Sequence, residues 1–504
     1  MQDSMSTHTL KTIQYGIAAI FLSTLLLLLL LYRKLLHPLS AYPGPAASTL
    51  SSWPLVFQAY TGTRHIQHYR DHAQYGPIVR ISPNALSFNT ASALHAIYAP
   101  RNVNVKKGEW YKTFDVAAGA YSSFTETERG VHAVKRRWVG ACFAGEGLRG
   151  AETRVGDVVE GFCDMFGGLG KRGRDGDGWG AKWNASEMCT YLGFDIMGSL
   201  VFGTDFRCVQ EEGNRQLALA VLPASRLMYW VYVQQKELEC DKDGHSSRTD
   251  FLSHLINAED KKTGWCPATE DLVAESLNLI NAGADPFSGV LAGAIFYLVH
   301  NTHALHKATE EVRSTFTCAS EIVNGAALNS CTYLFAVIEE TLRRTAPVPS
   351  HLPRVVLEGG MQIDGHHIPA GTTVGVPMYA LHNNPTYFPA PFTFAPKRWI
   401  ESPSNPAENV ALARKAFCPF SIGSRMCSGK ALAYLQLKLT LAHLLWRFDV
   451  RVAPDEPGRG GGRPELGIGR EREDEFQLWD ALGFGRDGPM VQVRSAQGSS
   501  GKDG

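Results

Sequence analysis

Residues 419–430, PFSIGSRMCSGK, place one cysteine, Cys427, close to two glycines and a cation. Gly423 and Gly429 permit backbone angles and close approaches that other residues resist. A loop of this kind can point several N–H groups at one atom, and a thiolate is stabilised by such donors and by a nearby cation, here Arg425. A helical pattern begins after Gly429, and a helix N-terminus also favours negative charge. The stretch therefore predicts a protected, permanently deprotonated sulfur.

A deprotonated cysteine in this setting is either a nucleophile or a metal ligand. A nucleophile usually needs a positioned base, and no histidine lies near Cys427 in the sequence. A thiolate that binds a single iron needs only the protecting loop. Cys418, which precedes Cys427 in the same region, lacks the glycine-rich setting and is expected to be an ordinary buried thiol.

A second candidate group lies in residues 337–347, VIEETLRRTAP, which contain Glu340 and Arg343. Residues at this spacing share one face of a helix and can form an ion pair. Most such pairs are solvated surface bridges that contribute little to stability, but the positions around this one are apolar. We therefore predict a structural role for the pair rather than a catalytic one.

A third candidate group interrupts residues 278–301, NLINAGADPFSGVLAGAIFYLVHN, which otherwise have the apolar pattern of a long buried helix. The middle of this segment contains Gly283, Asp285 and Pro286. A charge and a proline inside a buried helix both cost free energy. Either Asp285 only marks a kink in the helix, or these residues have a function that offsets the cost.

The elements that position these groups are mainly helical, with a minor sheet. Apolar residues recur at helical spacing in 124–144, 184–202, 268–281, 287–313, 332–344 and 428–447. Short runs typical of strands lie at 77–82, 86–88, 354–357, 361–363 and 373–376, and residues 359–374 form a predicted hairpin with glycine turns. Two glycine-rich stretches, 171–180 and 456–463, are expected to be flexible surface loops.

The N-terminal residues 13–32 contain no charged side chain. As a helix they would measure about 30 Å, the thickness of a bilayer core. A cleavable signal peptide has a shorter apolar core and a small-residue cleavage site. A buried core helix is the poorer alternative, because this segment is apolar all round and also lies at the terminus. We predict a membrane anchor, and Arg33 and Lys34 after it favour a cytoplasmic location for the rest of the chain.

The whole chain has 504 residues, with 49 Lys and Arg against 49 Asp and Glu. This zero net charge gives no indication of nucleic-acid binding, and ten cysteines without a CxxC pair argue against a secreted disulfide scaffold. The predicted divisions are a tail at 1–12, an anchor at 13–32, a proline-rich hinge at 33–48, one catalytic domain at 49–494 and a disordered tail at 495–504.

Residues 420–429, FSIGSRMCSG, resemble the haem-binding signature of the cytochrome P-450 family, Phe-x-x-Gly-x-Arg-x-Cys-x-Gly, at every fixed position. The resemblance implies that Cys427 is the axial thiolate on the iron of haem b, that Phe420 shields the sulfur and that Arg425 faces a haem propionate. It extends over nearly the whole chain and implies the cytochrome P-450 fold, mainly α with a small β region, preceded by one N-terminal transmembrane helix.

Other segments resemble further parts of the same family. Glu340 and Arg343, with Arg398 of FAPKRWI, correspond to a network that locks the segment holding the thiolate loop. In ERGVHAVKRRWVGACF, residues 128–143, His132 and Arg136 have the spacing of a pair that faces the propionates.

Two neighbouring assignments stay open. In PSHLPRVV, Arg354 corresponds to a further propionate ligand, and His351 is either a second donor or polar filler. Lys135 and Arg137 either meet an acidic reductase or form a solvated helix face.

The segment around Asp285 matches the family only in part. Gly283 corresponds to a glycine that opens a groove for dioxygen, and Asp285 to an acid that relays protons. Pro286 stands where the family usually has a hydroxyl residue, so ordinary proton delivery is in question. Ser288, three positions after Asp285, is a candidate replacement, as are water and a substrate hydroxyl.

The resemblance implies a membrane-anchored monooxygenase that uses haem, dioxygen and electrons from an NADPH-cytochrome P-450 reductase. It suggests a fungal enzyme of the endoplasmic reticulum membrane, with its catalytic domain facing the cytoplasm. The expected substrate is an apolar terpenoid, polyketide or alkaloid intermediate of secondary metabolism. The alternatives are an atypical haem-thiolate isomerase, dehydratase or oxidative cyclase, and a haem protein that binds a ligand without turnover.

Overall fold

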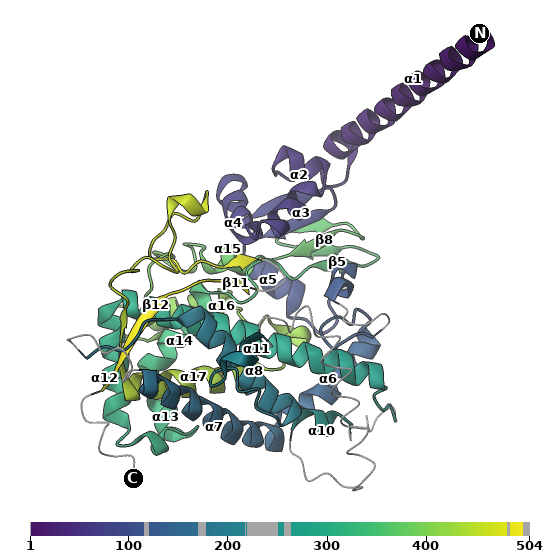
Figure 1. Ribbon diagram of the computed structural model, residues 1–504. Coiled ribbons are helices and arrows are strands. Elements are labelled where there is room, and N and C mark those ends of the chain that lie inside the picture. Colours follow the sequence, from purple (N-terminus) through teal and green to yellow (C-terminus); the bar gives the residue numbers. More distant parts are fainter. Residues whose placement is uncertain are drawn as a thin grey trace.

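A computed structural model describes residues 2–114, 120–169, 178–216, 218, 250–256, 264–480 and 484–496. Helices form most of the body; the sheet that contains β5 (Arg354–Val356) and β8 (Thr373–Gly375) lies on the side from which the N-terminal helix projects, and β12 (Met490–Ser495) lies at the left of the view (Figure 1). The mainly α fold with a small β region is therefore confirmed. Residues 170–177, most of one predicted glycine-rich loop, and residues 497–504 of the predicted tail lie outside the described part.

The described helices and strands have the following bounds. The α-helices are α1 (Gln2–Leu31), α2 (Ala46–Leu50), α3 (Trp53–Tyr60), α4 (Arg64–Tyr75), α5 (Ala91–Tyr98), α6 (Arg129–Gly140), α7 (Gly145–Leu169), α8 (Ala185–Phe202), α10 (Phe251–Ile256), α11 (Thr269–His300), α12 (Thr302–Thr315), α13 (Ala326–Ser330), α14 (Thr332–Arg344), α15 (Met378–His382), α16 (Ala407–Ala416) and α17 (Lys430–Arg447). The strands are β1 (Ile78–Ser82), β2 (Ala85–Phe88), β3 (Val105–Lys107), β4 (Trp183–Asn184), β5 (Arg354–Val356), β6 (Met361–Ile363), β7 (His366–Ile368), β8 (Thr373–Gly375), β9 (Phe448–Val452), β10 (Trp479–Asp480), β11 (Phe484–Gly485) and β12 (Met490–Ser495).

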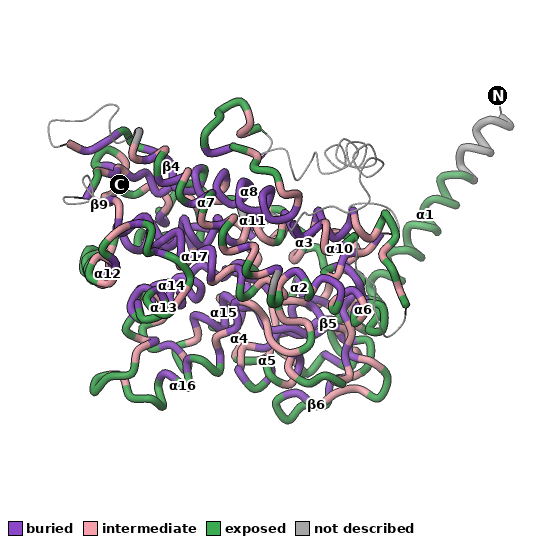
Figure 2. The backbone as a smooth tube through the Cα atoms, turned by 90° about the horizontal axis from the view of Figure 1, so that it is seen from below, coloured by how far each residue is buried: buried purple, intermediate pink, exposed green. Residues whose placement is uncertain are grey.

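The long helix α11 runs through the middle of the body, packed against α8, α10, α12, α14 and α17. Its neighbours α7, α8 and α17 are purple over much of their length in Figure 2, as is α11 itself, because they form the main hydrophobic core. Burial of apolar side chains stabilises this arrangement by about 25 cal/mol per Å². The core therefore fixes α11 and α17, which carry or adjoin two of the three candidate groups.

The largest sheet has five strands in the order β1-β2-β8-β5-β3. Strand β2 pairs with β8 in parallel, and the other pairs are antiparallel. In the β3–β5 pair, Lys107 lies directly opposite Arg354. The predicted hairpin is present as β6 and β7, and its turn residues Asp364 and Gly365 both have positive φ, at 50° and 80°. This is the Asp-Gly turn that suits the twist of a hairpin.

Two predicted helix boundaries were wrong. The segments 268–281 and 287–313 are not separated at Pro286, because α11 continues through it and the break comes only after His300. Helix α6 begins at Arg129 rather than at residue 124. Just before it, the backbone N–H of Ser122 donates to the Thr125 hydroxyl at 2.8 Å and that of Thr125 donates to the Ser122 hydroxyl at 3.2 Å. Such local bonds compete with a helix.

The glycine-rich stretch 456–463 is a packed turn and not a flexible surface loop. The N–H of Gly462 donates to the carbonyl of Arg472 at 2.8 Å. A Cβ at Gly461 would lie 2.3 Å from the carbonyl oxygen of Glu473, so close packing explains the glycine. Composition alone indicated a loop, but it could not show that another segment packs against the glycines.

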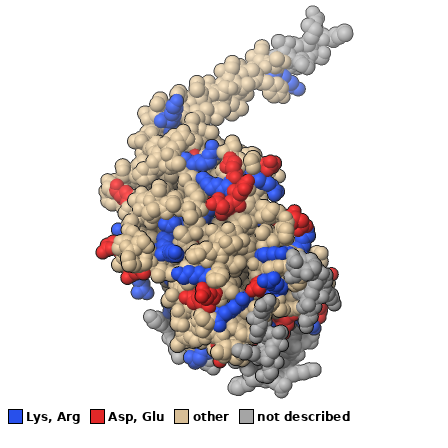
Figure 3. Space-filling model, turned by 90° about the vertical axis from the view of Figure 1, so that its left-hand side faces the viewer, with Lys and Arg blue, Asp and Glu red and all other residues tan. Residues whose placement is uncertain are grey.

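The N-terminal helix begins at Gln2, earlier than the predicted anchor, and a π-helical turn extends it to Leu36. Within the described part of the chain, two helical segments are long and apolar enough to cross a membrane. The segment Lys11–Leu36 has none of its most apolar stretch buried, whereas 78% of the corresponding stretch of Thr269–His300 is buried. The second is therefore a core helix, and only the first is a candidate anchor. Figure 3 shows this helix almost without charge, above a body face with both signs interspersed.

The segment between this helix and the body is tied to β1. Arg80 of β1 is 1% exposed, and its Nη1 donates to the carbonyl of Arg33 at 2.9 Å. The N–H of Arg80 donates to the carbonyl of Pro43 at 2.7 Å, and a Cβ at Gly44 would lie 2.2 Å from the Arg80 carbonyl oxygen. Leu39 is fully buried in a second hydrophobic cluster. The proline-rich segment is therefore fixed against the body by hydrogen bonds as well as stiffened by proline.

Candidate active site

Cys427 lies in a short loop that ends at the start of α17. Its backbone N–H donates to the carbonyl of Phe420 at 2.9 Å, and the N–H of Met426 donates to the carbonyl of Gly423 at 3.1 Å. The Cys427 side chain is exposed, whereas that of Cys418 is buried. The loop therefore holds its backbone rigidly and leaves one thiol accessible. The ring of Phe420 packs 5.3 Å from that of Tyr434, beside this loop.

The two glycines of the loop serve different purposes. Gly423 has a φ of +74°, and a Cβ there would lie only 2.0 Å from the carbonyl oxygen of Tyr98, so no other residue fits. Gly429 has an ordinary φ of −82°. A Cβ at Gly429 would make normal contacts, 3.7 Å from Phe143 and 3.9 Å from the Cys427 sulfur. Gly429 therefore needs no unusual backbone angle, and its part in haem binding stays a prediction.

The permanently deprotonated state of Cys427 stays a prediction for the iron-bound protein. Although Cys427 is exposed to solvent, the protein atoms around it partly desolvate the thiolate and raise the pKa of Cys427, and the N–H of Gly429 and the charge of Arg136 oppose this only in part. The cation that acts on the sulfur is thus Arg136 and not Arg425, which instead donates to the carbonyl of Glu126 at 3.3 Å. A lasting thiolate at this position needs a bound metal ion, whose charge deprotonates a coordinating thiol.

Three cations gather beside this loop. Lys107 and Arg354 are 5% and 4% exposed and lie directly opposite each other in the sheet. Arg425 is the third cation of this group. Burial and the nearby charge of Arg354 lower its pKa to about 10. Burial and the charges of Arg425 and Arg354 likewise lower the pKa of Lys107. Like charges opposite each other in a sheet are destabilising, so the arrangement calls for an anion.

The hydrogen bonds of these cations go to neutral groups. Lys107 donates to the carbonyl of Phe124 at 2.5 Å, and Arg354 donates to the hydroxyl of Tyr111 at 2.6 Å. Buried charges are normally paired with an opposite charge. An accessible thiol next to buried cations fits a haem, which offers one iron and two carboxylates. The residues present therefore suit the cofactor that the sequence implied.

Lys107 is the member of this cluster that the sequence did not reveal. The sequence shows only two adjacent lysines, Lys106 and Lys107, in a short polar stretch. Alternation along β3 directs the first outward and buries the second. The strand pattern could have indicated that Lys107 is buried. It could not show that Lys107 pairs with Arg354, because that residue is remote in sequence.

We expect Lys107→Met to have opposite effects on the two forms of the protein. Without haem, removal of a buried unpaired charge should leave the free energy of unfolding unchanged or raise it by about 1 kcal/mol. With haem, loss of a charged hydrogen bond should speed haem release by about 10 to 100-fold. Haem transfer to apomyoglobin and denaturant unfolding of the haem-free chain measure the two effects. Lys106→Met is the control, and equal haem release by both variants would contradict the assignment.

Helix α6 delivers two expected residues to this region. Burial and then the charges of Arg425 and Lys107 lower the pKa of His132 to about 2, so its ring is neutral near pH 7. Arg136 donates from Nη1 to the hydroxyl of Ser428, the residue after Cys427. Both residues therefore border the thiolate loop and the cation cluster.

The expected surface role of Lys135 was wrong. Its side chain is 5% exposed, and its Nζ pairs with Asp271 of α11 at 2.6 Å. Arg137 is exposed, as a docking residue must be. Two members of the basic run KRR therefore have different surroundings, because Lys135 forms an interior ion pair and Arg137 lies at the surface. Helix periodicity places neighbouring residues on different faces, and a count of charges does not show this.

The structure brings Glu340, Arg343 and Arg398 together in the core. Arg343 makes two hydrogen bonds to the Glu340 carboxylate, at 2.9 and 2.8 Å, and both side chains are fully buried. Arg398 Nε lies 3.5 Å from the same carboxylate, and the Trp399 indole N–H donates to it at 3.0 Å. Burial alone would raise the pKa of Glu340, but Arg343 and Arg398 hold it below its ordinary value.

Two candidate residues of α11 face the neighbouring helix α8. A Cβ at Gly283 would lie 2.4 Å from the Met197 sulfur, so this glycine permits close helix packing. The Ser288 hydroxyl is buried and donates to the carbonyl of Ala284 at 2.6 Å. A Cβ at Gly193 of α8 would lie 2.4 Å from that hydroxyl. Both residues therefore contribute to the contact with α8, and the dioxygen and proton roles expected of them stay predictions.

Asp285 forms an ion pair that the sequence did not predict. Its Oδ1 lies 2.7 Å from Nη1 of Arg486, and Nη2 of Arg486 donates to the Thr190 hydroxyl at 2.8 Å. The Asp285 side chain is 25% exposed, against 5% for Arg486. Arg486 follows β11, 201 residues away in sequence. Asp285 therefore keeps an accessible carboxylate whose charge is balanced by a buried arginine.

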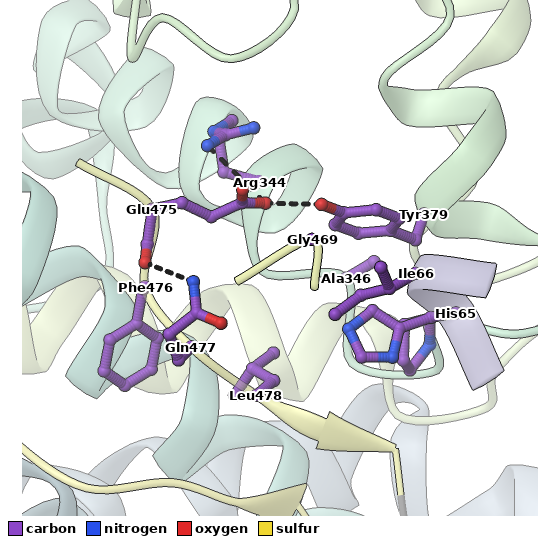
Figure 4. Close-up of a pocket in the computed structure, with 11 residues that line it drawn as sticks. His65, Ile66, Arg344, Ala346, Tyr379, Gly469, Glu475, Phe476, Gln477 and Leu478 are labelled. Atoms are coloured by element: carbon purple, nitrogen blue, oxygen red, sulfur yellow. Dashed lines mark hydrogen bonds and ion pairs between the residues drawn. The ribbon is translucent and has the colours of Figure 1, made fainter. Parts of the chain in front are cut away.

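A pocket separate from Cys427 lies between α4, α14 and the segment before β10 (Figure 4). Glu475 accepts a hydrogen bond from Tyr379 at 2.6 Å and lies 3.8 Å from Arg344 in this pocket. His351 lies near this side of the fold, with its ring 5.2 Å from that of His68. Both interpretations of His351, a second donor beside Arg354 and polar filler, stay predictions.

Comparisons with known proteins agree with this geometry. A family model described as Cytochrome P450 matches residues 225–461. The chain is 33% identical to cytochrome P450 monooxygenase fscF of Fusarium equiseti, with 93% of this chain and 94% of that protein covered. It is 34% identical to cytochrome P450 monooxygenase AKT7 of Alternaria alternata, covering 93% and 95%, and 32% identical to cytochrome P450 monooxygenase atnE of Emericella nidulans, covering 92% and 93%.

Proposed function

This chain belongs to the cytochrome P450 family and is a monooxygenase of that family, and from this premise we propose that Cys427 is the axial ligand of its haem iron. The proposed substrate is an apolar small molecule, a terpenoid, polyketide or alkaloid intermediate of fungal secondary metabolism. The observation that carries the proposal is the accessible thiol beside buried cations with neutral partners.

Each group of residues has a distinct part in this function. The haem, when bound, activates dioxygen, and its thiolate ligand favours cleavage of the O–O bond. Lys107, Arg354 and Arg425 would bind the haem carboxylates, and His132 would donate a hydrogen bond as a neutral ring. The network around Glu340 and Arg343 has a structural part, since it is fully buried.

We assign proton delivery to Asp285, because Ser288 and Gly283 are committed to packing against α8. Its carboxylate is partly exposed, so it can exchange protons with water, and it lies 2.7 Å from the buried Arg486. In Asp285→Asn, a larger share of NADPH electrons should be released as hydrogen peroxide. An unchanged share would remove Asp285 from this role.

Electrons are proposed to come from NADPH through a separate flavin reductase. Arg137 of α6 and Lys430 at the start of α17 are exposed and flank the Cys427 loop, since Arg136 bonds to Ser428 between them. A cationic surface here suits an acidic partner, and such encounters slow as salt rises. Reduction by NADPH and reductase should therefore fall several-fold between low and high salt, while reduction by dithionite should not.

A membrane location is proposed on two observations. Helix α1 exposes its apolar surface, and Arg33 and Lys34 follow it. Helix α3 adds Trp53, Phe57 and Tyr60, which are 75%, 66% and 87% exposed and lie on one face. We propose the endoplasmic reticulum membrane, with the body in the cytoplasm. Protease protection of the body in sealed microsomes would contradict this orientation.

The experiment that tests the proposed function is the carbon monoxide difference spectrum of the reduced protein. Thiolate ligation gives a Soret band that is shifted to longer wavelength than histidine ligation gives. We expect that band, together with consumption of dioxygen in the presence of reductase and NADPH. A colourless protein after expression with ample haem, or a spectrum typical of imidazole ligation, would overturn the proposal.

A further inference from the structure

Helix α11 has an accessible stripe within its buried length. Asn278 is half-buried, Ala282 is exposed and Pro286 is half-buried, while Leu279, Ile280 and Ala284 on the other side of the helix are buried. These three positions are spaced by four residues and therefore lie along one face of the helix. Pro286 has no N–H, so it gives no helical hydrogen bond to the carbonyl of Ala282. The stripe thus contains an amide and a carbonyl among apolar groups.

The amide of Asn278 has a fixed orientation. Its Nδ2 donates to Oε1 of Glu275 at 2.8 Å. Glu275 is fully buried, and it also accepts from the hydroxyl of Ser123 at 2.7 Å and from the backbone N–H of Ser123 at 2.6 Å. A carboxylate can only accept hydrogen bonds. It therefore holds the NH₂ group of Asn278 toward itself and leaves the Oδ1 atom on the side away from Glu275.

One short segment connects this arrangement to the Cys427 loop. Ser123 bonds to Glu275, and the carbonyl of Glu126, three residues later, accepts from Arg425. Arg425 lies two residues before Cys427. Residues 123–126 therefore connect Glu275, the partner of Asn278, to Arg425 in the Cys427 loop.

We propose that Asn278 Oδ1 accepts a hydrogen bond from the substrate and so selects an apolar molecule that carries a hydroxyl or N–H group. This inference rests on the proposed function, and it narrows the substrate class of the same site. A site built to accept a hydrogen bond rejects an analogue without the donor, because its acceptor is then left unpaired. An alcohol should bind more tightly than the ketone of the same skeleton.

Replacement of Glu275 by glutamine should reverse this preference. The backbone N–H of Ser123 still needs an acceptor, so the glutamine carbonyl oxygen takes that side. Its NH₂ group then faces Asn278, which must present Oδ1 to it and turn its own NH₂ to the side away from residue 275. An NH₂ group donates, and a ketone oxygen can accept from it. Glu275→Gln should therefore gain affinity for the ketone.

The test measures Kd from the Soret shift of the haem-loaded protein with two matched probe pairs, menthol with menthone and cyclododecanol with cyclododecanone. In the unaltered protein each alcohol should bind about tenfold more tightly than its ketone, the value of one net hydrogen bond. Asn278→Leu should remove the difference by weakening the alcohol. Glu275→Gln should remove it by strengthening the ketone. Asn329→Leu, on the exposed side of α13, is the control and should keep the tenfold ratio.

The outcomes separate this inference from the proposed function. Absence of the thiolate spectrum would contradict the proposed function itself. With that spectrum intact, equal Kd values for alcohol and ketone in the unaltered protein would overturn the inference, as would a ratio that Asn278→Leu leaves unchanged. Absence of binding by both alcohols would also overturn it. A Glu275→Gln variant that keeps the alcohol preference would show that Glu275 does not orient the amide.

Discussion

Cys427→Ala should lose the thiolate signature of the reduced, carbon monoxide-bound protein and reduce oxygen-dependent turnover to background. Alanine cannot ligate iron. The groups that face the sulfur cannot replace it, because the N–H of Gly429 is a hydrogen-bond donor and Arg136 is a cation. Because the loop is held by the bond from its own N–H to Phe420, the substitution should leave the fold intact.

Cys418→Ala is the matched control for this experiment. Cys418 is buried, and burial raises the pKa of its thiol to about 12, so it stays protonated and does not compete for iron. This variant should keep the spectrum and the turnover. Retention of the thiolate signature by Cys427→Ala, or its loss from Cys418→Ala, would move the ligand to another residue.

Arg343→Met should destabilise the protein by about 3–5 kcal/mol, the usual cost of leaving one partner of a buried ion pair without its counter-charge. Arg343 satisfies both oxygens of Glu340 and also donates to the carbonyl of His382 at 2.7 Å. Since folded domains are stable by only about 5–15 kcal/mol, most of this variant should fail to accumulate as haem protein.

The measurement is the yield of soluble haem protein, followed by denaturant unfolding of what is recovered. The double variant Glu340→Leu with Arg343→Leu removes both charges and should recover part of the loss. Arg207→Met is the control, because Arg207 pairs with Glu211 at the surface with 59% of its side chain exposed. It should cost less than about 1 kcal/mol. A similarly small cost for Arg343→Met would contradict the structural role.

Local patterns in the sequence predicted what depends on neighbours along the chain. The spacing of Glu340 and Arg343 indicated their pair, the Asp364–Gly365 turn indicated the hairpin, and the pattern after Gly429 indicated α17. These features form through contacts within a few residues, so periodicity and turn chemistry are sufficient to find them.

Contacts between distant segments were beyond the same reasoning. Asp285 meets Arg486 across 201 residues, and Ser123 meets Glu275 across 152. The burial of Lys135 was missed for a related reason, because its partner is Asp271 on another helix. The motifs therefore located the reactive cysteine, while the charges and amides that surround it became visible only once the helices were packed.

The attachment of residues 33–48 to strand β1 has a consequence for how the enzyme meets its substrate. Arg80 and the glycine at position 44 leave the polypeptide little freedom to swivel where helix and body join. If the first helix spans a bilayer, this attachment fixes the orientation of the body and its distance from the membrane surface. An apolar molecule that diffuses in the bilayer then meets the same face of the enzyme at each encounter.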